Sequence, residues 1–158
     1  NGSTSCDETP NGTYTSATGM TEALVCPAGT YSEGASTSCS DCPGGTWSVA
    51  GFATCTSCGV GEYSYSRASE CTLCAAGTAT DTTGSSSCSA CEAGSYQSKN
   101  GSTSCDETPN GTYTSATGMT EALVCPAGTY SEGASTSCSD CPGGTWSVAG
   151  FATCTSCG

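Results

Sequence analysis

Apolar residues are too few and too scattered along this chain to follow a helical period. Isoleucine is absent, and leucine and phenylalanine occur only as Leu24, Leu73, Leu123, Phe52 and Phe151. The chain contains short runs that favour extended backbone, such as residues 30–32, and each run is followed by a turn signal such as Gly34. The pattern predicts a series of small β-hairpins without helices.

The hairpin pattern repeats as a module of 16 or 17 residues, in which a second cysteine follows the opening cysteine 13 or 14 positions later. A glycine stands three residues after each opening position, which indicates positive φ or a close approach of two chain segments. These glycines are Gly12, Gly29, Gly45, Gly61, Gly77 and Gly94. One such hairpin is too small to be stable alone, so successive modules are expected to stack on one another.

Five positions after the opening position, most modules carry an aromatic residue. These residues are Tyr14, Tyr31, Trp47, Tyr63 and Tyr96, and Ala79 takes this place in one module. Because aromatic side chains provide the largest contact area in the chain, each ring is expected to pack on a disulfide or on the next module. The alternative is a ladder of rings against which sugars stack.

A longer period of 99 residues contains the modules, since residues 1–59 recur without a change as residues 100–158. This identity indicates a recent duplication or a repeat-copying process, and a longer natural array. The predicted segments are 1–8 (end of a cut module), 9–25 (lacking the disulfide), 26–41, 42–57, 58–73, 74–90, 91–107, 108–124 (lacking the disulfide), 125–140, 141–156 and 157–158 (start of a cut module).

Sixteen cysteines in 158 residues are dense enough for cross-links to take the place of an apolar core. The spacing C-x2-C-x12-C-x2-C also comes close to a zinc ribbon, and it occurs at Cys39, Cys42, Cys55 and Cys58. Against zinc stand the absence of histidine and the presence of Asn-x-Ser/Thr sequons, which have meaning only in the secretory pathway. The preferred interpretation is a secreted protein with disulfides and no bound metal.

Two modules lack both of their cysteines, and this joint absence bears on how the others pair. Thr9 and Ala23 occupy the cysteine positions in one of them, and Thr108 and Ala122 in the other. If the two cysteines of a module are bonded to each other, losing both leaves no thiol without a partner. The predicted bridges are Cys26–Cys39, Cys42–Cys55, Cys58–Cys71, Cys74–Cys88, Cys91–Cys105, Cys125–Cys138 and Cys141–Cys154.

A rival scheme pairs the cysteines within each C-x-x-C and then joins Cys6 to Cys26 and Cys105 to Cys125. Such adjacent bridges are strained and usually redox-active, which favours the first scheme. In the first scheme each closed loop contributes about 3 kcal/mol to stability. Cys6 and Cys157 are then expected to pair with cysteines beyond the given residues.

Four N-glycosylation sequons begin at Asn1, Asn11, Asn100 and Asn110. Each of these asparagines precedes glycine, so a tight turn explains them equally well, and a turn and a glycan are compatible. Serine and threonine make up 54 of the 158 residues, either as solvated filler or as sites of dense O-linked glycosylation. Covalent glycans are expected, and no other cofactor.

The formal net charge is −12, because fourteen carboxylates face only Arg67 and Lys99. The chain lacks the cations that replace phosphate counterions, which argues against nucleic acid and anionic membrane surfaces as partners. No apolar run is long enough for insertion into a membrane.

Catalytic activity is not expected, because without histidine a serine or cysteine nucleophile has no ordinary base. Paired carboxylates could serve a glycosidase, but these modules are too small to form a substrate cleft. The carboxylates considered are Asp7, Glu8, Glu33, Asp41 and Glu92.

The run C-P-A-G-T-Y at residues 26–31, followed by C-S-D-C at residues 39–42, resembles the ephrin-receptor-like cysteine-rich repeat and the smallest module of tumour-necrosis-factor-receptor domains. The resemblance covers essentially the whole chain in diverged copies. In that module the first cysteine is bonded to the second, which agrees with the joint absence described above. The resemblance implies an elongated ectodomain of small, disulfide-rich modules of all-β or irregular structure.

These features predict a structural extracellular glycoprotein, a segment of a long disulfide-linked filament, stalk or surface appendage. Self-association, or contact with neighbouring repeats of the same array, is the expected interaction. The alternative is a cell-surface coat antigen or receptor ectodomain that binds a protein or carbohydrate partner. A zinc-binding array is the third hypothesis.

Overall fold

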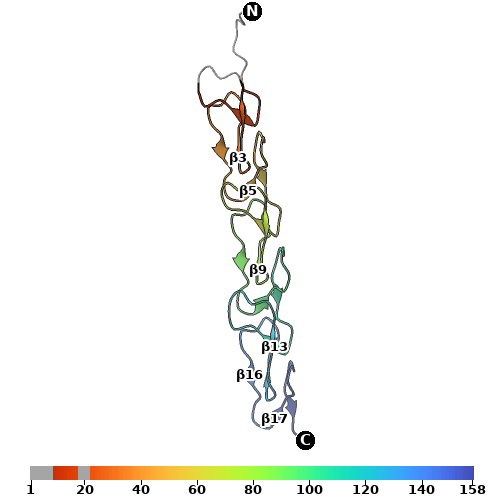
Figure 1. Cartoon of the computed structure of the whole chain (residues 1–158). Coiled ribbons are helices and arrows are strands. Elements are labelled where there is room, and N and C mark those ends of the chain that lie inside the picture. Colours follow the sequence, from red (N-terminus) through yellow and green to blue (C-terminus); the bar gives the residue numbers. More distant parts are fainter. Residues whose placement is uncertain (1–8, 18–21) are drawn as a thin grey trace, which may run out of the picture. The chain divides into compact units, whose positions relative to one another are not determined.

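The computed structural model describes residues 9–17 and 22–158, and this part of the chain contains very short strands and no helix (Figure 1). The strands are β1 (Thr13–Tyr14), β2 (Leu24–Val25), β3 (Thr30–Tyr31), β4 (Ser40–Asp41), β5 (Thr46–Trp47), β6 (Thr56–Ser57), β7 (Glu62–Tyr63), β8 (Thr72–Leu73), β9 (Thr78–Ala79), β10 (Ser89–Ala90), β11 (Ser95–Tyr96), β12 (Asp106–Glu107), β13 (Thr112–Tyr113), β14 (Leu123–Val124), β15 (Thr129–Tyr130), β16 (Ser139–Asp140), β17 (Thr145–Trp146) and β18 (Thr155–Ser156).

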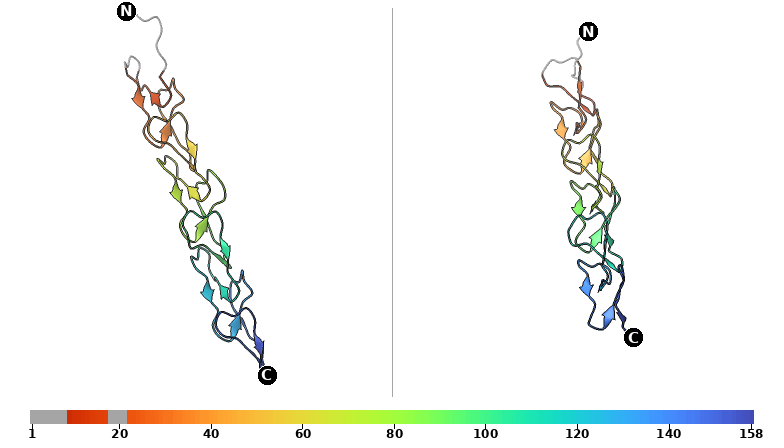
Figure 2. Two further views of the ribbon diagram at one scale, coloured as in Figure 1. Left: turned by 90° about the vertical axis from the view of Figure 1, so that its right-hand side faces the viewer. Right: turned by 60° about the horizontal axis from the view of Figure 1, so that its bottom comes forward.

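These strands pair two by two into nine two-stranded sheets, and the partners lie within one predicted module. In β3 and β4 the register is antiparallel, with Thr30 opposite Asp41 and Tyr31 opposite Ser40. The equivalent pairs recur through the chain (Figure 2). The prediction of a disulfide-rich, all-β tandem array is confirmed.

The contacts divide the chain into two compact units. The first runs to Thr72 and includes Thr82–Ser87, and the second consists of Leu73–Asp81 and Cys88–Gly158. The chain therefore passes back into the first unit within the module 74–90. Every contact between modules described below lies inside one unit.

Seven disulfides close seven of the hairpins, and they join the same pairs that the sequence predicts. They are Cys26–Cys39, Cys42–Cys55, Cys58–Cys71, Cys74–Cys88, Cys91–Cys105, Cys125–Cys138 and Cys141–Cys154. Cys39 and Cys42 are thus each bonded to the other cysteine of their own module. The rival scheme, which bonds them to each other, is wrong. Cys157 is exposed and unbridged, and Cys6 lies outside the described residues.

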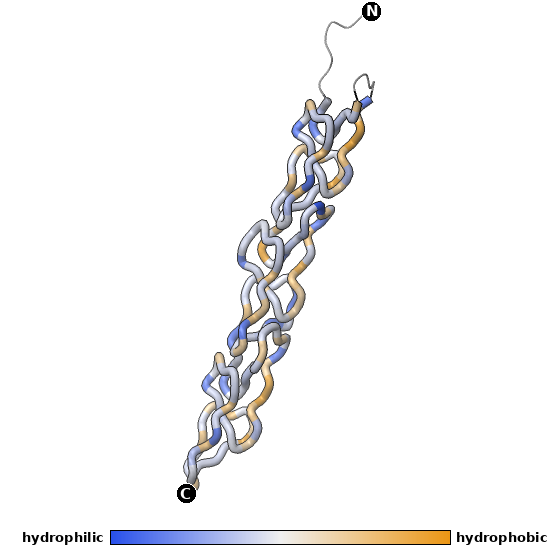
Figure 3. The backbone as a smooth tube through the Cα atoms, turned by 90° about the vertical axis from the view of Figure 1, so that its left-hand side faces the viewer, coloured by the Kyte–Doolittle hydropathy of each residue, from blue (hydrophilic) through white to orange (hydrophobic). Residues whose placement is uncertain are grey.

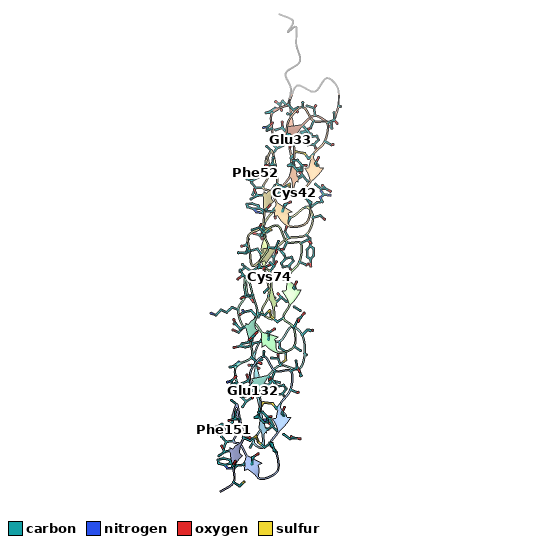
Figure 4. All side chains as sticks on the ribbon, turned by 180° about the vertical axis from the view of Figure 1, so that it is seen from behind. Glu33, Cys42, Phe52, Cys74, Glu132 and Phe151 are labelled. Carbon is teal, nitrogen blue, oxygen red and sulfur yellow. A yellow bond between two sulfur atoms is a disulfide. The ribbon has the colours of Figure 1, made fainter. Side chains whose placement is uncertain are left out.

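Sulfur, and not a cluster of large aliphatic side chains, fills the interior. The opening cysteines Cys26, Cys42, Cys74 and Cys125 have no exposed surface, and Figure 4 shows Cys42 and Cys74 inside the ribbon. Apolar stretches along the backbone are short and alternate with polar ones (Figure 3). The cross-links therefore occupy the volume that leucine and isoleucine fill in ordinary domains.

In the second module without a bridge, a hydroxyl replaces the opening sulfur. Thr108 is 2% exposed, and its Oγ1 accepts a hydrogen bond from the backbone N–H of Ser135 at 2.9 Å. Strands β13 and β14 still pair, with Tyr113 opposite Leu123 and Thr112 opposite Val124. The hairpin thus keeps the register of the bridged modules without the covalent link.

Candidate functional site

The junction between one module and the next is a recurring arrangement of hydrogen bonds and close backbone contacts. Three module positions form it. The inner glycine stands three residues after the opening position, and the inner polar residue stands six after it. The turn residue is the positive-φ residue at the hairpin tip, nine or ten after the opening position. In the module 42–57 these are Gly45, Ser48 and Gly51.

The first contact of the junction is a backbone hydrogen bond from the inner glycine to the following module, and it recurs in seven modules. The N–H of Gly29 donates to the carbonyl of Ser48 at 2.9 Å. The same bond joins Gly12 to Ser32, Gly45 to Ser64, Gly77 to Gln97, Gly94 to Thr114, Gly111 to Ser131 and Gly128 to Ser147. Its acceptor is always the inner polar residue of the next module.

The second contact uses the side chain of that inner polar residue. Ser48 is completely buried, and its Oγ donates to the carbonyl of Thr30 in the preceding module at 2.9 Å. Ser64, Thr114, Ser131 and Ser147 donate in the same way. In the described residues no buried side-chain nitrogen or oxygen lacks a hydrogen-bond partner. Sequence reasoning missed this column, although the signal is present, because a serine or threonine stands six residues after every opening position except Cys91, where the residue is Gln97.

The third contact places each turn residue on the two modules before its own. The N–H of Gly51 donates to the carbonyl of Cys26, one module earlier, at 2.9 Å. The carbonyl oxygen of Gly51 lies where a Cβ on Gly12, two modules earlier, would stand. Gly84 contacts Cys58 and Gly45 in the same manner. Each hairpin tip therefore depends on an inner glycine without a side chain, which confirms the close approach predicted from the glycine pattern.

Three turn residues adopt the left-handed conformation without being glycine. They are Ala35 (φ 49°), Arg67 (φ 64°) and Ala134 (φ 44°). A non-glycine residue there costs about 1–2 kcal/mol. These hairpin tips are retained because their N–H groups still bond to the preceding module, as Ala35 does to Thr9 at 2.9 Å.

Replacing Ala35 by glycine is expected to stabilise the first unit by about 1 kcal/mol, because glycine adopts positive φ without steric cost. Thermal unfolding followed by circular dichroism measures the change. Ala50→Gly is the control, since Ala50 is an exposed turn residue without positive φ. If Ala35→Gly destabilises the protein as much as Ala50→Gly does, φ strain at the hairpin tip is not the cause.

Replacing Ser48 by alanine is expected to lower the free energy of unfolding by about 1–2 kcal/mol, because the carbonyl of Thr30 loses a buried donor. Urea denaturation gives this value. Ser40→Ala, at an exposed position of β4, should change stability by less than about 0.5 kcal/mol. Equal effects of the two changes would contradict a special role for the buried hydroxyl.

Most aromatic residues are half-buried, whereas Tyr65, Trp146 and Phe151 are exposed, and the described residues contain two ring contacts, each within a single module. Trp47 and Phe52 have centroids 6.3 Å apart, and Tyr63 and Tyr65 meet edge to face at 5.5 Å. These two pairs are contacts between rings of one hairpin, and the expected packing of each ring on a disulfide or on the next module stays a prediction. Figure 4 shows Phe52 and Phe151 at the edge of the ribbon, and Phe151 is exposed.

Of the four sequon asparagines, Asn11, Asn100 and Asn110 are exposed, and Asn1 lies outside the described residues. The Oδ1 of Asn100 accepts a hydrogen bond from the N–H of Ala76 at 2.9 Å. The Oδ1 of Asn110 lies 2.9 Å from the place of a Cβ on Gly133. Whether these asparagines carry glycans stays a prediction.

Three of the carboxylates considered for catalysis belong to the described residues. Glu33, Asp41 and Glu92 are exposed, and Asp7 and Glu8 lie outside the described residues. Asp41 forms an ion pair with Arg67, with Asp41 Oδ1 and Arg67 Nε 3.3 Å apart. Both side chains are more than half exposed, so this pair contributes little to stability.

Metal ligation is not suggested by the described residues. Among them, no three His, Cys, Asp or Glu side chains are grouped as metal ligands. The fourteen bridged cysteines have no free thiolate. Nor does the described part of the chain contain a helix of the length and apolar character needed to span a membrane.

Disulfide-closed hairpins that bond to the next module through one recurring junction define a cysteine-rich tandem-repeat protein. A family profile described as tyrosine-protein kinase ephrin type A/B receptor-like matches residues 45–87 and 83–125, together more than half of the chain. The chain belongs to this ephrin-receptor-like family, as the resemblance of its modules predicts. No curated protein matches the chain. The family and the disulfides identify an extracellular repeat domain.

Proposed function

We propose that the chain is a structural segment of an extracellular glycoprotein, a part of a long disulfide-linked repeat filament, stalk or surface appendage. It acts mechanically, with covalent bridges inside modules, backbone hydrogen bonds between modules and sugars on the outside. The chain has no catalytic role and uses no cofactor apart from covalent glycans. Its partners are neighbouring repeats of the same array and other copies of itself.

The observation that supports this proposal most is the recurring junction. Within each unit, the inner glycine and the turn residue of successive modules make the same backbone bonds. Inner polar residues such as Ser48 and Ser131 are buried, and their hydroxyls donate to the preceding module. A junction with the same geometry between successive modules is typical of an array in which each repeat stabilises its neighbours.

Negative-stain electron microscopy of the native protein tests the proposal. Fibres of uniform width that contain the protein are the expected result. Short, separate particles that do not associate would contradict a filament. That result would favour the alternative, a coat antigen or receptor ectodomain, which the name of the matched family also brings into consideration.

A further inference from the structure

The described sequons occur in two structural settings. Asn11 and Asn110 stand near the start of the two modules without a bridge. Asn100 stands at a hairpin tip between Cys91 and Cys105, which are bonded to each other. The loss of cysteines therefore coincides, in both copies, with an Asn-Gly-Thr sequon.

The sequon at Asn100 is held by a module that precedes it in the chain. Asn100 Oδ1 accepts from Ala76 at 2.9 Å, and the N–H of Gly101 donates to the carbonyl of Cys74 at 2.7 Å. The hydroxyl of Ser102 donates to the carbonyl of Lys99 at 3.0 Å. All of these partners are synthesised before Asn100, so this tip can fold as soon as its own bridge closes.

The sequon at Asn110 depends on the module that follows it. The N–H of Gly111 donates to the carbonyl of Ser131 at 2.8 Å, and Asn110 Oδ1 lies against Gly133. Thr108, at the start of the same module, accepts from Ser135. These contacts cannot form until residues 125–140 have been synthesised, and no bridge closes the module in the meantime. The sequon thus stays unfolded for longer than the one at Asn100.

We infer that the missing bridge keeps the sequons at Asn11 and Asn110 open to N-linked glycosylation, whereas closure of Cys91–Cys105 competes with glycosylation at Asn100. This inference rests on the proposed function as an extracellular glycoprotein. The donor is a lipid diphosphate-linked oligosaccharide. The asparagine Nδ2 forms a bond to the anomeric carbon, the bond from that carbon to the diphosphate oxygen breaks, and the amide proton passes to a base of the transferase.

The folded structure can retain the glycan once it is attached. Asn110 is exposed, and the reaction uses Nδ2, so Oδ1 keeps its place beside Gly133. Gly133 has φ 91° and no side chain to meet that oxygen. In the finished fold the hydroxyl of Thr112, the third residue of the sequon, donates to Pro109 at 2.6 Å. Attachment therefore precedes folding of this module.

The test is to restore the missing bridge. Thr108→Cys with Ala122→Cys places cysteines in a hairpin whose register matches that of the bridged modules. In a eukaryotic secretory cell, the unglycosylated fraction at Asn110 is expected to rise about twofold or more, because a disulfide can now close first. The matched variant, Cys91→Ala with Cys105→Ala, should lower the unglycosylated fraction at Asn100.

Mass spectrometry separates the sites. After reduction, trypsin cleaves behind Lys99 and releases the peptide 100–158, which separates the second copy from the first. Cleavage after Glu107 then places Asn100 and Asn110 in different peptides. Thiol labelling confirms that the new bridge forms, and a reducing agent in the culture should return Asn110 to the wild-type value. Unchanged occupancy at both sites in both variants would overturn this inference alone. Absence of glycan at every sequon, in the native protein and all variants, would overturn the glycoprotein proposal as well.

Discussion

Replacing Gly45 by alanine should lower the free energy of unfolding of the first unit by more than about 3 kcal/mol. Two costs combine at this position. Gly45 has φ 85°, a conformation that alanine adopts only with strain, and the carbonyl oxygen of Gly84 occupies the place of the added methyl group. That oxygen belongs to backbone, so the hairpin tip of the module 74–90 must move away.

The contacting hairpin tip supplies a control, Gly84→Ala. Gly84 also has positive φ, 72°, but the atom nearest to its added Cβ is Ser57 Oγ at 3.8 Å, an ordinary contact distance. This change should therefore cost only the conformational strain, about 1–2 kcal/mol. Hydrogen exchange resolved by peptide should report a larger increase in the exchange of residues 58–90 for Gly45→Ala than for Gly84→Ala. Equal losses for the two glycines would show that the contact two modules away has no energetic weight.

Removing one bridge, with Cys42→Ala and Cys55→Ala together, is expected to cost about 3 kcal/mol. The bridge joins cysteines 13 positions apart in the sequence and so restricts the unfolded chain. Guanidinium denaturation with circular dichroism as the readout measures the loss. The loss should concentrate in the first unit, which contains both cysteines.

The comparison under reducing conditions separates the covalent link from side-chain packing. Cys42 is fully buried, so alanine also removes some contact area there. After full reduction both proteins lack the link, and most of the difference between them should disappear. If the whole difference persists after reduction, packing of Cys42 and not the bridge determines the stability of the hairpin.

Much of the fold follows from the sequence because cysteine and glycine have few alternative uses. A cysteine pair lost together, as at Thr9 and Ala23, leaves little choice of partner for the remaining cysteines. A glycine at the same place in every module indicates positive φ or close approach, and Gly45 has both. The hairpins and their spacing can therefore be predicted from the cysteines and glycines alone.

The buried polar column could not be recognised in the same way. Serine and threonine are so common here that Ser48, which is buried, cannot be told from Ser40, which is exposed. Positive φ at Ala35 and Arg67 was equally hidden, because neither residue type favours it. The division of the chain within the module 74–90 depends on contacts between distant segments, which a local pattern does not encode.

The position of the bridges also determines how the chain responds to a nick. When a peptide bond is hydrolysed between an opening and a closing cysteine, both broken ends remain attached through sulfur. Arg67 and Lys99, the only basic residues, both lie inside such loops. Between Cys105 and Cys125 no bridge encloses the backbone, so a single scission there breaks the covalent chain, as it does in the two-residue links between bridged modules. The module 108–124 is therefore the longest stretch between the first and the last bridge in which one cut divides the chain.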